Sequence, residues 1–146
     1  MNITPEIKKY VGLWSACPLD DGGATDYQII LLLSGNGVTA EFNWYLCDIS
    51  DIVWSVTDEV LTIAHNRVSS GNHIFNEVYV FMGNVELECI SGRKETFDCI
   101  QSYNGNRLYR KIKSEATDEE IERKLKDYIS FLREEILLQQ EETKCL

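Results

Sequence analysis

The sequence predicts a mainly β protein, an antiparallel up-and-down β-barrel of eight or nine strands followed by one C-terminal α-helix. Three observations predict this fold class. Short β-rich runs follow one another from residue 10 to residue 113, Gly- and Asn-rich segments of a few residues separate them, and a segment with helical spacing comes last. Strands this closely spaced cannot alternate with helices, so they should pair as antiparallel hairpins, and closure into a barrel removes the unpaired edges.

The expected strands alternate apolar and polar side chains, which is the pattern of a sheet with one buried face and one wet face. The segment VTAEFNWYL, for example, sets Val38, Ala40, Phe42, Trp44 and Leu46 on one side. That side can face a solid core, a ligand pocket or the inner wall beneath a protein-binding surface, and the pattern leaves the three open. The strands are expected at residues 10–17, 27–33, 38–46, 51–56, 60–66, 73–81, 85–90, 95–102 and 107–112.

The segments between these strands carry turn chemistry. Gly and Asn tolerate a positive φ at little cost, and they recur between the apolar runs. Each such segment is expected to close a hairpin between neighbouring strands. The turn segments are SGNG (34–37), TDE (57–59), MGN (82–84), SGRK (91–94) and YNGN (103–106).

After residue 113 the sequence predicts one helix, extending to about residue 140. Thr117 followed by Glu120 is a capping-box signature, and the next residues lack Gly and Pro. An apolar stripe should bury against the barrel or another chain, and Phe131, Leu137 and Leu138 widen it enough for a partner or a homodimer. We expect residues 1–113 to form the barrel and residues 114–146 the helix and an acidic tail, within one domain. The stripe comprises Ile121, Leu125, Tyr128, Ile129, Leu132 and Ile136.

Composition narrows the functional class. The first segment lacks the apolar run of a secretory signal, so we expect a soluble cytoplasmic protein. The five cysteines form no C-x-x-C pair, and Cys47, Cys89 and Cys99 are expected to be reduced packing residues on strands. The net charge of −10 repels phosphate backbones and anionic lipid, so we expect no direct nucleic-acid or membrane binding, whereas a basic protein would be attracted.

The order of short motifs resembles that of the lipocalin family. YVGLWS places Gly12 and Trp14 in a G-x-W motif on the first strand, LLLSGNGVTAEFNWYL and IVWSVTDEVLTI follow, and LYRKI closes the barrel. The pattern spans about residues 10–113 and is similar to the small lipocalin-like domains of bacteria. The resemblance implies a barrel followed by a helix, and a structural pair in which Trp14 packs beneath Arg110 or Arg107 of the last strand.

Signals for catalysis are weak, so we expect no enzyme, no cofactor and no metal site. The two histidines, His65 and His73, could form a metal trio with Glu77 only if the hairpin between them brought all three together. LDDGGATD (19–26) lacks the order of a calcium loop, and no P-loop, G-x-S-x-G or G-x-G-x-x-G is present. An enzyme therefore ranks third among the functional hypotheses.

Two binding hypotheses rank above it. In the first, an acidic inhibitor or immunity-type protein binds and neutralises a basic protein partner, with contacts expected from Tyr27, Tyr45, Asp48, Asp51, Tyr79 and Tyr103. In the second, a lipocalin-like carrier or sensor binds a small apolar ligand inside the barrel, or side chains fill that space as a solid core. The interior is expected to be lined by Phe42, Trp44, Trp54, Ile63, Phe75 and Phe97.

Overall fold

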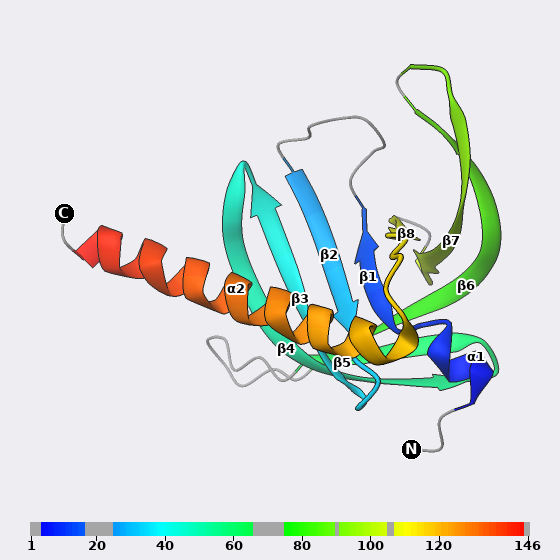
Figure 1. Ribbon diagram of the computed structural model, residues 1–146, viewed down its shortest axis with the longest axis horizontal. Coiled ribbons are helices and arrows are strands. Elements are labelled where there is room, and N and C mark those ends of the chain that lie inside the picture. Colours follow the sequence, from blue (N-terminus) through cyan, green and yellow to red (C-terminus); the bar gives the residue numbers. More distant parts are fainter. Residues whose placement is uncertain (1–3, 17–24, 66–74, 90, 105–106, 145–146) are drawn as a thin grey trace.

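The computed structural model describes residues 4–16, 25–65, 75–89, 91–104 and 107–144. It contains a closed antiparallel barrel of eight strands, with one long helix on its outside (Figure 1). The predicted fold class is therefore confirmed. The elements are α1 (Pro5–Lys8), β1 (Gly12–Ser15), β2 (Thr25–Leu31), β3 (Asn36–Asn43), β4 (Tyr45–Thr57), β5 (Val60–His65), β6 (Phe75–Glu88), β7 (Lys94–Ser102), β8 (Leu108–Lys111) and α2 (Asp118–Lys144).

The strands follow sequence order around the barrel, and every neighbour is antiparallel. Closure comes from β1 and β8, where Trp14 lies opposite Lys111 and Ser15 opposite Arg110. In this antiparallel topology the last residues of β1, β3, β5 and β7 lie at one end of the barrel, which we call the open end. The N-terminal helix α1 and the start of β1 lie at the other end, which we call the closed end (Figure 1).

Two apolar clusters lie on opposite sides of the barrel wall. The inner cluster fills the closed half of the barrel, and the outer cluster packs the wall against α2. Side chains alternate across a strand, so each strand contributes to both clusters. The inner cluster comprises Tyr10, Trp14, Ile29, Leu31, Ile52, Trp54, Leu61, Ile63, Tyr79, Ile100 and Tyr109, and the outer cluster comprises Ile30, Leu32, Val38, Ala40, Leu46, Leu125, Ile129 and Leu132.

The apolar side of VTAEFNWYL faces α2 rather than the barrel interior. Val38, Ala40 and Leu46 belong to the outer cluster, and Phe42 packs against it. The expectation that Phe42 lines the interior is therefore wrong, because a covering helix makes the outer face of this strand as apolar as an inner face. Trp44 is not part of either face, since the strand ends at Asn43 and Trp44 sits in the turn with a φ of 64°.

The segment MGN is a second departure from the expected pattern. β6 continues through it as one strand, with a register shift against β7 between Phe81 and Gly83. Gly83 has a φ of 72°, which supplies the backbone conformation of a β-bulge rather than of a hairpin turn. Two expected strands therefore merge into one long strand, and the barrel has eight strands rather than nine.

The closed end is sealed by buried aromatic side chains. Trp14 is fully buried, and its indole N–H donates to the Tyr10 carbonyl over 2.9 Å. The cation at its ring is Lys111, with Nζ 5.7 Å from the ring centroid. Gly12 makes room for that side chain, because a Cβ there would lie 2.8 Å from Lys111 Cε. The Trp14 partner implied by the family resemblance differs, because Arg110 lies over Phe97 and Arg107 over Tyr27.

The helix α2 crosses the outer wall, and its C-terminal part extends past the barrel (Figure 1). Polar contacts hold it in place: Glu122 Oε2 accepts from the Leu33 N–H over 2.8 Å, and Tyr128 donates to Gln28 Oε1 over 2.7 Å. Arg133 pairs with Asp51, and Asp118 pairs with Lys8. Phe131, Leu137 and Leu138 remain exposed, and a homodimer through them stays a prediction. Within the described residues, no helix combines the length and apolarity that crossing a membrane requires.

The cysteines divide by position. Cys89 and Cys99 are buried thiols, in agreement with the expected packing role, whereas Cys47 is exposed. The expectation of a packing role is therefore wrong for Cys47, the third residue of β4.

Candidate functional site

The open half of the barrel holds a polar cavity of about 190 Å³, which we call the cup. It lies above the inner cluster, and side chains from β2, β3, β4, β5, β6 and β8 reach it. Antiparallel partners share a face, so the pairing of Glu41 with Tyr27 and with Asp48 places all three on the inner side. The cup is lined chiefly by Tyr27, Thr39, Glu41, Asp48, Ser50, His65, Glu77, Tyr79, Arg107 and Tyr109.

Glu77 is the centre of one hydrogen-bonded group in the cup. His65 Nε2 lies 2.9 Å from Glu77 Oε1, and the Tyr79 hydroxyl donates to Glu77 Oε2. The hydrogen bond from His65 is the main cause of a lowered Glu77 pKa, and burial opposes it. Glu77 is therefore held as a carboxylate, and the buried His65 is fixed in orientation by it.

Arg107 forms a second group with the aromatic side chains. Its guanidinium lies 3.6 Å from the centroid of the Tyr27 ring, and its Nη1 donates to the Tyr109 hydroxyl over 3.4 Å. The Tyr79 and Tyr109 rings meet edge to face at 5.6 Å between centroids. Burial raises the pKa of both Tyr79 and Tyr109, so the two phenols stay neutral hydrogen-bonding groups.

The cup carries an excess of negative charge. Glu41, Asp48 and Glu77 line it, against one arginine and one histidine. Glu41 and Asp48 are direct cross-strand partners, so two of these carboxylates lie side by side on the inner face. Carboxylates and phenol rings together are the groups that bind an ammonium or a guanidinium. The cup therefore combines side chains that are chemically suited to an organic cation.

Exposed aromatic side chains lie at the same end of the barrel. Trp44 and Tyr45, at the β3–β4 turn, are 81% and 64% exposed, and Tyr103, after β7, is 75% exposed. Trp44 has a positive φ, which is a strained conformation for a bulky residue. Such strain is concentrated at functional sites. We call these three residues the aromatic rim.

The residues expected to contact a partner divide into three groups. Tyr45 and Tyr103 are exposed in the aromatic rim, and Tyr27 and Asp48 line the cup. Tyr79 also lines the cup, but it is 2% exposed and cannot form a surface contact. Asp51 lies on the outer wall, where Arg133 of α2 binds it. The Asp51 side chain is 61% exposed there, so its contact with a partner stays a prediction, whereas burial excludes Tyr79 as an exposed contact.

Only some of the residues expected to line the barrel interior do so. Trp54 and Ile63 belong to the inner cluster, as expected, whereas Phe42 and Trp44 do not. Phe97 is buried but faces outward, because Ile100, three residues later on β7, faces inward, and Arg110 lies over its ring at 5.2 Å. Phe75 begins β6, and its side chain lies outside the described residues.

Sequence reasoning missed the cup as a whole. It considered His65 and Glu77 only as metal ligands together with His73, which lies outside the described residues. Among the residues that the structure describes, no group of three or more His, Cys, Asp or Glu side chains is placed to hold a metal. The sequence does contain a signal, because several strands carry polar residues at inward positions near their ends. Only the register between the strands shows that these residues form one site.

The fold and the cup define a small antiparallel β-barrel with a polar binding cavity at one end and a helix on its wall. Comparison of the chain with protein-family models, with curated proteins and with solved structures finds no match in any of the three.

Proposed function

We propose that this chain is a lipocalin-like, non-enzymatic binding protein that takes a cationic group into the cup and neutralises the basic protein carrying that group. The observation that carries the proposal is the set of three carboxylates, Glu41, Asp48 and Glu77, around a cavity with one arginine and one histidine. A lysine or arginine side chain of a partner could form charge-assisted hydrogen bonds with the carboxylates that line the cup.

Two further features favour a protein as the source of that cation. The net charge of −10 would steer a basic protein toward the chain and raise the association rate. The aromatic rim offers exposed Trp44, Tyr45 and Tyr103 beside the cup, and aromatic anchors contribute strongly to protein interfaces. The cytoplasmic location expected from the sequence is part of the same proposal.

A second candidate is a carrier or sensor for a free small amine. The volume of about 190 Å³ and the phenol rings of Tyr27, Tyr79 and Tyr109 favour it. A small apolar ligand inside the barrel is less well supported, because the inner cluster fills the closed half with its own side chains and the open half is polar.

Isothermal titration calorimetry of the full chain tests the proposal with two probes, a hexa-arginine peptide and agmatine. We expect saturable binding of the peptide, and at least about tenfold weaker binding to an E41Q/D48N variant. An E115Q/E134Q variant is the matched control, because it removes the same charge from two exposed positions outside the cup. Its affinity should stay within about twofold of the unmodified chain.

An equal loss of peptide affinity in the two variants would show that the binding is non-specific charge attraction, and it would contradict the proposal. Absence of binding by both probes would do the same. Agmatine binding as tight as peptide binding would favour the free amine over the protein partner.

A further inference from the structure

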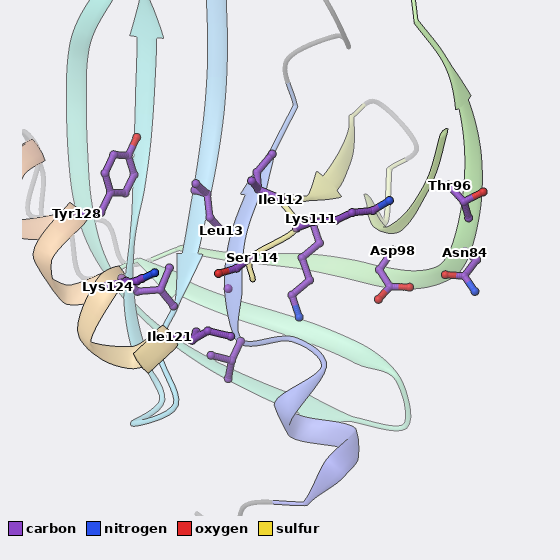
Figure 2. A pocket seen from close by; sticks show the side chains of 14 residues that line it. Leu13, Asn84, Thr96, Asp98, Lys111, Ile112, Ser114, Ile121, Lys124 and Tyr128 are labelled. Atoms are coloured by element: carbon purple, nitrogen blue, oxygen red, sulfur yellow. The ribbon is translucent and has the colours of Figure 1, made fainter. Parts of the chain in front are cut away.

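A second cavity lies outside the barrel wall near the closed end, between α2, the start of β1 and the segment after β8. It has a volume of about 550 Å³, and we call it the groove. Figure 2 shows its walls: the start of β1, the segment after β8, the first turns of α2, and the part of the β6–β7 hairpin that projects beyond β8. The volume falls within the range of roughly 300–1,000 Å³ typical of small-molecule sites.

The floor of the groove is apolar. Leu13 of β1, Ile112 after β8, and Ile121 of α2 lie between Lys124 and Lys111 in Figure 2. Leu125 of α2 and Val11 complete the floor. Most of these side chains belong to the outer cluster or pack against it. The contacts that hold α2 on the barrel wall therefore also hold the floor of the groove.

The polar edge of the groove is positively charged, whereas the molecule as a whole is negatively charged. Lys111, Lys113 and Lys124 line it, with Asp98 as the one acid among its lining residues, in a chain of net charge −10. Lys124 forms no ion pair within the described part of the chain, and Lys113 has a ring contact with Phe97 at 4.9 Å. Both ammonium groups are therefore available to a ligand.

Lys111 contributes differently from the other two lysines. Its Nζ donates to the Lys9 carbonyl over 2.7 Å, and burial lowers its pKa. An anion placed in the groove would offset the cost of burying this ammonium. Three amines around an apolar floor complement one negative group attached to a small apolar body.

We propose that the groove binds a small amphiphilic monoanion, an alkyl or aryl carboxylate, with its apolar body on Leu13, Ile112 and Ile121 and its carboxylate at the lysines of the polar edge. This ligand differs in charge from the ligand of the cup, and it binds outside the barrel wall. The site therefore stands independently of the function proposed above.

Titration of the full chain with octanoate, octanol and octylamine tests this site, because the three probes share one body and differ in charge. We expect saturable octanoate binding, and at least about tenfold weaker binding of the other two probes. NMR cross-peaks should connect the octanoate chain to the methyl groups of Leu13 and Ile121. Cross-peaks to Ile63 of the inner cluster instead would overturn the proposal.

Two double variants complete the experiment. K113Q/K124Q should weaken octanoate binding by about tenfold, whereas R123Q/K126Q, which removes two exposed charges of α2 outside the groove, should change it by less than about twofold. Equal effects of the two variants, or equal binding of octanoate and octanol, would contradict the proposal. The E41Q/D48N variant of the cup should keep full octanoate affinity, so failure at one site is distinguishable from failure at the other.

Discussion

Glu41 of β3 lies directly opposite Asp48 of β4, and both side chains line the cup. Like charges in direct cross-strand register destabilise a sheet. The two carboxylates therefore bring like charges together at the lining of the cup, and a bound cation there would offset their repulsion.

Neutralising Glu41 is expected to stabilise the free protein. The E41Q variant removes the repulsion, so its free energy of unfolding should rise by about 0.5 kcal/mol, less at high salt. Urea unfolding followed by tryptophan fluorescence measures this, with E134Q as a control that should stay unchanged. A loss of more than about 1 kcal/mol in E41Q would show that Glu41 supports the fold instead.

Glu77 should make stability depend on pH in the acid range. Its pKa is lower in the folded chain than the ordinary value of 4.5, so its contribution is fully present above that value and is lost as the pH falls through the lowered pKa. At pH 7 the E77Q variant should be less stable by about 0.5–1 kcal/mol, a figure reduced for screening because the Glu77 side chain is 40% exposed.

The measurement for Glu77 is urea unfolding of both proteins between pH 7 and pH 3. The difference between them should shrink as the pH falls below 4.5. A difference that stays constant over this range would contradict the ionised state of Glu77 in the cup.

Trp44 is expected to serve binding at a cost in stability. Its φ of 64° is unfavourable for a bulky residue, and its side chain is 81% exposed. Asn accepts this conformation, so W44N should gain about 0.5–1 kcal/mol in unfolding free energy while weakening hexa-arginine binding by about fivefold. Thermal unfolding and calorimetry measure the two effects. A destabilised W44N that keeps full affinity would be the opposite result.

Substitution by alanine should reduce the stability of the protein by different amounts at two glycines. A Cβ at Gly37 would lie 2.0 Å from the Ile30 carbonyl oxygen, so the backbone between β2 and β3 would have to move. Gly83 has open space around it but a φ of 72°. We expect G37A to cost about 3 kcal/mol or more and G83A about 1 kcal/mol. Urea unfolding of the two variants gives the order, and a reversed order would refute this account of the two positions.

Much of the fold could be predicted from local chemistry. The capping box at Thr117 is present, since its Oγ1 accepts from the Glu120 N–H over 3.3 Å, and α2 follows it. Most of the predicted turn segments also lie between two strands, as their Gly and Asn residues predicted. The short helix α1 was not expected, although Thr4 caps it and Pro5 begins it.

The faces of the strands could not be predicted in the same way. Alternation of period two separates the sides of VTAEFNWYL but does not say which side is inner, because α2 buries the outer side as well. The cup depends on register between residues up to eighty positions apart, such as Tyr27 and Arg107, and no local pattern contains that information. The turn at Trp44 contains no Gly, and the alternation of apolar and polar residues continues through it, so the pattern predicts an unbroken strand.

NMR titration of the isotopically labelled full chain with the hexa-arginine peptide tests the central claim most directly. We expect saturable shift changes at Tyr27, Asp48, His65 and Glu77, which line the cup, and at the aromatic rim, with the outer wall beneath α2 unaffected. Shift changes confined to the acidic residues in the first turn of α2, or none at all at saturating peptide, would contradict a cation site at the open end of the barrel.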